Sequence, residues 1–190
     1  LHEVYARGCP DYSGRVTVPL LYDSVTDTLV SNESADILRM LETVFLPFAS
    51  SPLDLVPENQ RDDIDALNAL IHDGLNNAVY RSGFAETQEA YEAAVDTVFE
   101  TLDKLEDRLS DRQWLMGSDL TEPDIRLFPT LARFDVAYHT AFRCLRRRLV
   151  DYPRLWAYAR RFYALPGVAD TVTFDIYRRG YFSPSPKRHP

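Results

Sequence analysis

The sequence predicts an α+β fold that is mostly α-helical, with a small hairpin unit ahead of a helical domain. Only one stretch, residues 15–30, has the β-branched and apolar composition of strands. After residue 31 the apolar residues recur with the 3.6-residue period of helices. The 190-residue chain is 45% hydrophobic and 26% charged, which is the composition of a globular protein. No apolar stretch approaches the roughly 20 residues of a membrane span, so we expect no membrane partner.

The charge of the chain is unevenly distributed. The net charge is -8, yet residues 143–190 hold eleven basic and only three acidic side chains. A basic end can bind nucleic acid, but the acidic majority would repel a phosphate backbone. We therefore expect no nucleic-acid partner, and we expect the basic end to meet acidic helices of its own fold or of a symmetry mate.

The two cysteines, Cys9 and Cys144, cannot cross-link a disulfide scaffold and have no metal-ligand spacing. The four histidines are scattered as well, so we expect no metal. A reducing compartment follows, and we expect the cytoplasm. Residues 1–5 contain neither an initiator Met nor a signal peptide, so we expect the sequence to start within a longer protein.

The predicted hairpin has a strand at residues 15–22, a polar turn at 23–28 and a returning strand at Leu29 and Val30. Pro19 lies inside the first strand, where it cannot donate to a ladder. It therefore indicates a sheet edge or a cis peptide bond.

Helical periodicity begins directly after the hairpin. Ser31 or Asn32 is expected to cap a first helix, which ends at Pro47. Further helices are predicted from about residue 58, over 86–109 and over 153–164. Thr121-Glu122-Pro123-Asp124 predicts the start of another helix, because the Asp124 carboxylate can reach back to the Thr121 amide in a capping box.

Several blocks of sequence are more specific than these patterns. Val18-Pro19 followed by Glu33-Ser34 is general to glutathione transferases, whereas two later blocks are more particular: Asn-Asn-Ala-Val-Tyr at 76–80 and Pro-Gly-Val-Ala-Asp-Thr-Val at 166–172. Together they resemble the glutathionyl-hydroquinone reductases, the Xi class of glutathione transferases, over roughly residues 1–182. The resemblance implies that residues 1–47 are the C-terminal half of a thioredoxin-like glutathione-binding domain. Residues 58–182 would then form the all-α C-terminal domain, and 183–190 a flexible tail.

The resemblance also implies a glutathione site on five residues. The backbone edge at Val18, beside a cis Pro19, can exchange hydrogen bonds with the cysteinyl unit of glutathione. Ser34 and the helix N-terminus suit the γ-glutamyl carboxylate, and Glu33 suits its ammonium. Arg15 is placed for the glycyl carboxylate.

Tyr80 and Tyr181 match the family tyrosines whose hydroxyls meet the hydroquinone oxygens. A phenol suits this role, because it offers a donor, an acceptor and a flat ring for stacking. Tyr138 and Tyr177 are expected to serve packing only. The family commonly has His where this chain has Ala141 and Gly180, so the substrate range is open.

The implied activity is the glutathione-dependent reduction of glutathionyl-hydroquinones to hydroquinones by thiol exchange, with glutathione as co-substrate. The family's nucleophile lies in a Cys-Pro-Trp motif, which these 190 residues do not contain. No catalytic residue is therefore expected within this chain, and Cys144 is expected to be buried and inert. Two alternatives stay open: an omega-type thiol transferase or dehydroascorbate reductase, and a non-catalytic association module. A homodimer is expected in either case.

Overall fold

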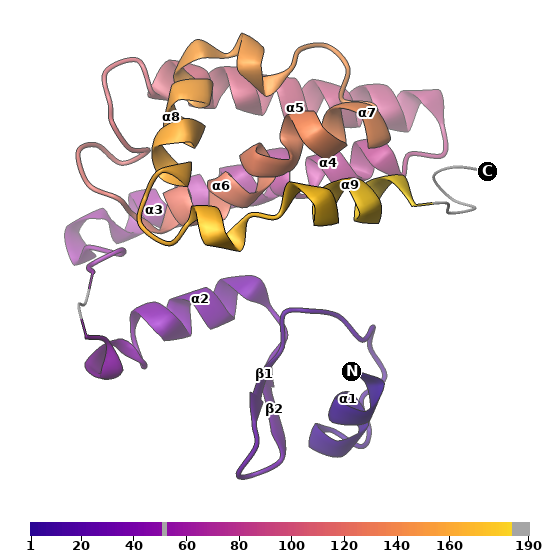
Figure 1. Cartoon of the computed structure of the whole chain (residues 1–190), viewed down its shortest axis with the longest axis vertical. Coiled ribbons are helices and arrows are strands. Elements are labelled where there is room, and N and C mark those ends of the chain that lie inside the picture. Colours follow the sequence, from indigo (N-terminus) through magenta and orange to yellow (C-terminus); the bar gives the residue numbers. More distant parts are fainter. Residues whose placement is uncertain (51–52, 184–190) are drawn as a thin grey trace. The chain divides into compact units, whose positions relative to one another are not determined.

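The structure is a computed structural model that describes residues 1–50 and 53–183. The chain divides into two compact units, Leu1–Asp54 and the part from Leu55 onward (Figure 1). The first unit holds the small sheet, and the second is helical. This architecture confirms the predicted fold class.

The first unit is built around an antiparallel hairpin. Strand β1 is Leu21–Asp23 and strand β2 is Thr28–Ser31, with Tyr22 paired to Leu29. The turn closes because the Asp23 carboxylate accepts the amides of Val25 and Thr26 at 2.8 and 3.3 Å. The predicted strand at residues 15–22 was too long, since only its end belongs to the ladder. Pro19 has no amide hydrogen to donate, and the Val18–Pro19 bond is cis.

A short helix before the hairpin was not predicted. Helix α1, His2–Gly8, buries only Tyr5, whose hydroxyl donates to the Thr17 carbonyl at 2.9 Å. Gly8 lets this helix approach the hairpin closely, because a Cβ at that position would lie 3.0 Å from Leu29. Seven residues with a single buried side chain give almost no periodic signal, which explains the miss.

The first predicted helix is present, but its cap was assigned wrongly. Helix α2 is Ser34–Glu42, and its N-cap is Glu33 rather than Ser31 or Asn32. Ser31 is the last residue of β2, and its hydroxyl accepts the Glu33 amide at 3.1 Å. A short 3-10 turn, η1 (Leu46–Phe48), follows α2 and contains Pro47.

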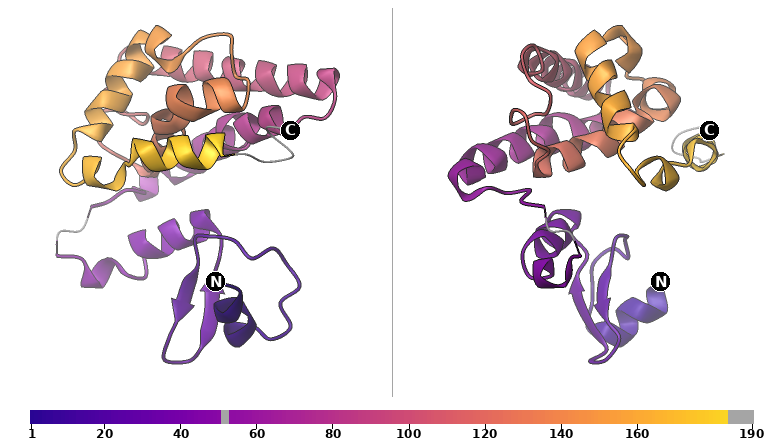
Figure 2. Two further views of the ribbon diagram at one scale, coloured as in Figure 1. Left: turned by 45° about the vertical axis from the view of Figure 1, so that its right-hand side comes forward. Right: turned by 60° about the vertical axis from the view of Figure 1, so that its left-hand side comes forward.

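The second unit consists of helices of several kinds, which pack around one apolar core. In chain order they are η2 (Glu58–Gln60), α3 (Arg61–Ile71), the π-helix η3 (His72–Asn76), α4 (Ala78–Gly83), α5 (Gln88–Arg108), α6 (Glu122–Arg133), the π-helix η4 (Phe134–Tyr138), α7 (His139–Ala141), η5 (Leu149–Asp151), α8 (Pro153–Tyr163), η6 (Ala169–Thr171) and α9 (Phe174–Phe182). Within this unit α5 and α9 lie on opposite sides (Figure 2). Helix α9 was not predicted, and it buries none of its residues.

The predicted capping box at the start of α6 is confirmed. The Asp124 carboxylate accepts the Thr121 amide at 2.9 Å and the Leu115 amide at 2.9 Å. It also accepts the hydroxyls of Thr121 and Tyr158, at 3.1 and 2.9 Å. Burial raises the pKa of this carboxyl, although all of these hydrogen bonds act in the opposite direction.

The basic end of the chain pairs with acidic side chains of its own fold. Arg146 and Arg147 form ion pairs with Asp96 and Asp103 on α5. Glu106 of α5 accepts the Arg154 and Leu155 amides, at 2.9 and 2.8 Å, in the first turn of α8. The basic end therefore contacts an acidic helix of its own chain, as expected.

The predicted tail, 183–190, lies outside the described residues except for Ser183, the C-cap of α9. None of the helices in the described ranges is long and apolar enough to cross a membrane. Residues 1–50 and 53–183 also contain no cluster of three or more His, Cys, Asp or Glu side chains that could hold a metal ion.

Candidate functional site

The start of helix α2 presents polar groups to solvent. Glu33 is the N-cap, and both Glu33 and Ser34 are exposed. The first amides of a helix have no partner inside the helix, and they carry the positive end of its dipole. A carboxylate placed at this end is therefore stabilised, while the Glu33 side chain offers the opposite charge one residue earlier.

A hydrogen-bond network ties the loop before the hairpin to this helix start. The Asn32 amide donates to Tyr12 and Thr17 hydroxyls at 3.3 and 3.4 Å. Tyr12 in turn donates to the Arg15 carbonyl at 2.7 Å. These bonds join Thr17, which precedes Val18, to Asn32, which precedes Glu33. The structure thus brings the two halves of the predicted glutathione site together.

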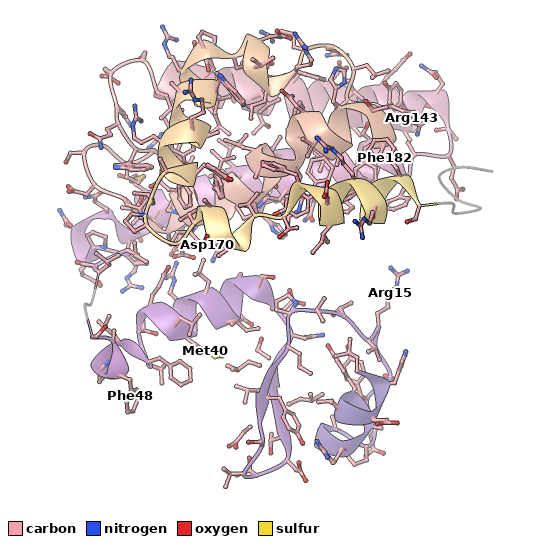
Figure 3. The ribbon with its side chains drawn as sticks, viewed as in Figure 1. Arg15, Met40, Phe48, Arg143, Asp170 and Phe182 are labelled. Carbon is pink, nitrogen blue, oxygen red and sulfur yellow. The ribbon has the colours of Figure 1, made fainter. Side chains whose placement is uncertain are left out.

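Val18 lies on that loop with 73% of its surface exposed. No hydrogen bond to its backbone is found in the described ranges, so its amide and carbonyl have no partner there. The Arg15 side chain is also exposed and extends from the loop away from α1 (Figure 3). The loop thus offers a free backbone edge and a cation from one short segment.

The second predicted site is a cluster of three phenols in the helical unit. The hydroxyls of Tyr80 and Tyr181 are 2.8 Å apart, although the residues are 101 positions apart in the sequence. The Tyr138 hydroxyl lies 3.1 Å from Tyr181 and 3.4 Å from Tyr80. Helix α4, the π-helix η4 and helix α9 each supply one phenol of this cluster.

Phe142 forms the apolar base of the phenol cluster. Its ring stacks on Tyr138 with centroids 5.3 Å apart and meets Tyr80 and Tyr181 edge to face at 5.0 and 5.4 Å. Gly83 makes room for this ring, because a Cβ at Gly83 would clash with it. The cluster is therefore built into the packing of the domain.

The three phenols differ in how deeply they are buried, and burial raises the pKa of two of them. Tyr138 is 3% exposed, and its burial, followed by the neighbouring Tyr80, raises its pKa far above the ordinary value. Burial also raises the pKa of Tyr181 to about 12. Tyr80 is 39% exposed. Burial thus favours the neutral hydroxyls of Tyr138 and Tyr181, while Tyr80 is the phenol most open to solvent.

The expectation that Tyr138 serves packing only was incomplete. Tyr138 does pack in the core, yet its hydroxyl completes the cluster. The available signal was the spacing of Phe134, Tyr138 and Phe142, which puts three aromatic rings on one helical face. Tyr177 has a different neighbour, since the Arg133 guanidinium lies 4.3 Å from its ring centre.

Two positions around the cluster differ from the resembled family. A Cβ at Gly180, next to Tyr181, would meet no atom within 4 Å, so the chain has open space there. Ala141 precedes Phe142 and packs partly against the core. Neither residue offers a polar side chain to a bound molecule.

Neither cysteine is placed as a nucleophile. Cys144 is fully buried, and burial raises the pKa of its thiol to about 11. Cys9 is the C-cap of α1, at the negative end of the helix dipole. The expectation of a buried, inert Cys144 is consistent with this geometry.

Comparisons with known proteins agree with this architecture. Residues 88–161 match the family model described as "Glutathione S-transferase, C-terminal domain". The chain is 45% identical over 190 residues to the glutathionyl-hydroquinone reductase PcpF of Sphingobium chlorophenolicum, covering all of this chain and 61% of that protein. It is 48% identical over 182 residues to the glutathionyl-hydroquinone reductase YqjG of Escherichia coli (strain K12), covering 96% of this chain and 56% of that protein.

A solved structure extends the match. The Xi glutathione transferase ECM4 from Saccharomyces cerevisiae in complex with glutathione superposes with a TM-score of 0.89 at 32% identity, covering 100% of this chain and 68% of that one. The chain therefore spans between about half and two thirds of the length of these relatives. The chain has the two expected units, it matches the family model, and it is similar to this solved structure. It therefore belongs to the Xi class of the glutathione transferases.

Proposed function

We propose that this chain supplies the hydroquinone-binding side and part of the glutathione-binding side of a glutathionyl-hydroquinone reductase. The observation that carries the proposal is the convergence of the Tyr80 and Tyr181 hydroxyls at 2.8 Å from distant parts of the sequence. Two relatives over nearly the whole chain bear the name of this activity. A hydroquinone has two ring oxygens that need hydrogen-bond partners, and paired phenols provide them.

The reaction is thiol exchange. A cysteine thiolate attacks the glutathionyl sulfur, the bond between that sulfur and the ring carbon breaks, and the ring carbon takes up a proton. The hydroquinone leaves, and glutathione remains bound to the enzyme as a mixed disulfide. A second glutathione attacks this disulfide, which releases oxidised glutathione and restores the thiol. The nucleophile would come from a Cys-Pro-Trp motif, which these 190 residues do not contain.

Within this scheme the chain's own residues bind and orient the substrate. The exposed Val18 backbone, beside Pro19, pairs with the cysteinyl unit of glutathione. Glu33 and Ser34 at the start of α2 hold the γ-glutamyl amine and carboxylate, and Arg15 holds the glycyl carboxylate. The phenol cluster holds the ring oxygens and stabilises the negative charge that develops as the ring departs.

Tyrosine-to-phenylalanine variants test the proposal in a full-length protein that contains this chain. Tyr80→Phe or Tyr181→Phe should lower the turnover of a glutathionyl-hydroquinone roughly tenfold or more, which is about 1.4 kcal/mol. Glutathione affinity and melting temperature should hardly change, because the swap preserves the ring packing. Tyr177→Phe is the matched control, since Tyr177 lies one helical turn from Tyr181 in α9 and contacts Arg133 instead.

Unchanged turnover in both variants would contradict the hydroquinone assignment. Preferred turnover of dehydroascorbate would favour an omega-type thiol transferase.

We further propose that the protein works as a homodimer in the cytoplasm. Closed two-fold symmetry is the commonest arrangement of soluble oligomers. Two cysteines that form no disulfide fit a reducing compartment. A single monomeric species in sedimentation at micromolar concentration, at both low and high salt, would contradict the dimer.

A further inference from the structure

The loop between α1 and the hairpin carries two of the residues proposed to bind glutathione, Arg15 and Val18. Residues 13–18 form no hydrogen bond between backbone groups within the described ranges. Ordering a loop of this kind costs conformational entropy, which other contacts must offset. The position of the Arg15 cation therefore depends on the side chains that bind the backbone of the loop.

Two tyrosines supply these contacts. The Tyr5 hydroxyl donates to the Thr17 carbonyl at 2.9 Å and accepts the Thr17 amide at 3.4 Å. The Tyr12 hydroxyl donates to the Arg15 carbonyl at 2.7 Å. The centres of the two rings lie 4.8 Å apart, and Tyr5 is only 2% exposed. The Tyr12 ring therefore packs on a buried neighbour, and its hydroxyl holds the backbone of Arg15.

The same Tyr12 hydroxyl contacts the segment that enters helix α2. It accepts the side-chain amide of Asn32 at 3.3 Å, and Asn32 directly precedes Glu33, the N-cap of this helix. A phenol can donate one hydrogen bond while it accepts another, so both bonds form at once. One hydroxyl thus connects the residue that carries the cation to the neighbour of the carboxylate.

Gly14 gives the Tyr12 hydroxyl room to reach the Arg15 carbonyl. A Cβ at Gly14 would lie 2.6 Å from the Tyr12 hydroxyl oxygen and 2.8 Å from the ring carbon that bears it. A larger residue at this position would push the ring away from its acceptor. The sequence between Tyr12 and Arg15 is therefore suited to this hydrogen bond.

The Arg15 side chain has no contact of its own that fixes its place. It is exposed, and its guanidinium forms no hydrogen bond or ion pair with any residue in the described ranges (Figure 3). The backbone thus determines where this cation lies. Glutathione has a carboxylate at its glycyl end and a charged amine and carboxylate at its γ-glutamyl end. Binding both ends requires a defined separation between Arg15 and the start of α2.

We propose that Tyr12 is a positioning residue for glutathione. Its hydroxyl holds the Arg15 backbone at the separation from the start of α2 that the glycyl carboxylate requires. This role rests on the proposed function, because Tyr12 acts through Arg15 and does not touch the ligand. A ligand without the glycyl carboxylate does not depend on this separation.

Calorimetric titration of a full-length protein that contains this chain tests the role of Tyr12. Tyr12→Phe should weaken glutathione binding about fivefold, the usual effect of losing one neutral hydrogen bond. Arg15→Ala should weaken it about tenfold or more. Glutathione glycinamide, in which an amide replaces the glycyl carboxylate, should bind each variant within twofold of its affinity for the wild type. The double variant should bind glutathione within twofold of Arg15→Ala, because effects that act through one residue do not add.

Tyr22→Phe is the matched control and should change the affinity for neither ligand. The Tyr22 hydroxyl bonds to Arg7 at 3.0 Å and to Asp27, both away from the loop. Thermal melting shows whether each variant keeps its fold.

Three results would overturn the role of Tyr12. The first is an unchanged glutathione affinity in Tyr12→Phe beside a loss in Arg15→Ala, which leaves the proposed glutathione site intact. The second is an equal loss for glutathione and its glycinamide in Tyr12→Phe, which would show a general loosening of the loop. The third is an unchanged affinity in Arg15→Ala, which would also remove Arg15 from the proposed glutathione site.

Discussion

At the scale of single residues, the environment sets what identical side chains do. Three phenols lie within hydrogen-bond distance of one another, yet one is 3% exposed and another 39% exposed. Burial raises the pKa of Tyr138, because a phenolate is less well stabilised in the interior than in water. The open Tyr80 keeps its face available to a ring. The cluster therefore has a packed side and a side that is open to solvent.

The raised pKa of Tyr181 predicts a loss of stability at high pH. The folded pKa is about 12, against 10.0 for an unfolded tyrosine. Between these values the unfolded chain has lost this proton while the folded chain keeps it, so the free energy of unfolding falls as pH rises. In urea unfolding at pH 8 to 12, the wild-type chain should therefore lose stability more steeply than Tyr181→Phe above pH 10. Parallel curves for the two proteins would contradict the shift.

Glu33 belongs to the residue scale too, because the role proposed for it depends on a single charge. Glu33→Gln, in a full-length protein that contains this chain, should weaken glutathione binding by about 1.5–3 kcal/mol, the usual contribution of a charge-assisted hydrogen bond. The helix should survive, since no side-chain hydrogen bond caps α2. Asp36→Asn is the control, as Asp36 is an exposed carboxylate in the same first turn. Calorimetric titration measures the glutathione affinity of both variants. Equal losses of affinity would show that any negative charge in this turn has the same effect, which would contradict a direct contact of Glu33.

At the scale of elements, helix α5 organises the basic end of the chain. Its carboxylates at Asp96 and Asp103 form ion pairs with the segment after Cys144. Glu106, on the same helix, accepts two amides at the start of α8, which has no side-chain cap of its own. One helix thus supplies the missing cap of another. The ion pairs are about half exposed and contribute little by themselves, so the cap is the stronger contact.

Removing this cap should destabilise the helical unit. Glu106→Ala leaves two first-turn amides of α8 without an acceptor and removes a negative charge from the positive end of the helix dipole. We expect the free energy of unfolding to fall by about 1–2 kcal/mol in urea titration. Glu100→Ala is the control, because Glu100 is an exposed carboxylate on the same helix. An equal loss of unfolding free energy in the two variants would contradict the cap, because it would show that only the net charge of α5 matters.

At the scale of the whole molecule, the two units differ in how they are built. Tyr5 is the one fully buried hydrophobic residue of the first unit in the described ranges, whereas the second unit has a continuous core. The first unit is held instead by hydrogen bonds such as those of Tyr5, Tyr12 and Asn32. The glutathione surface proposed for the first unit is therefore mostly backbone and polar groups, while the phenol cluster of the second unit is aromatic.

The placement of both cysteines predicts the behaviour of the isolated chain. The 190-residue chain should not reduce glutathionyl-hydroquinones, because Cys144 is buried and Cys9 lies at the C-terminal end of its helix. Iodoacetamide should modify Cys9 in the native chain and modify Cys144 only after unfolding. Mass spectrometry and a turnover assay check this together. Robust turnover that Cys9→Ser abolishes would show that the nucleophile has been misplaced.

The sequence by itself determined the fold class, the hairpin turn, the capping box at Thr121 and Asp124, and the helix predicted over 86–109, which is α5. These features depend on neighbours within a few positions, which a linear pattern records. The same patterns missed α1 and α9, because both are short and bury almost nothing. They also placed the cap of α2 too early, since Ser31 is drawn into the sheet by pairing with Leu21.

Only the tertiary structure decided which distant groups meet. The contact between Tyr80 and Tyr181 spans 101 positions, and Tyr138 joins it because a π-helix follows α6. The network from Asn32 to Thr17 and Tyr12 likewise depends on a loop folding back onto a helix start. Spacing along a chain shows which residues share a helical face, but it does not show which distant segments meet. Burial of the core brings these segments together, and many sequences can bury a core with different side chains at its edge.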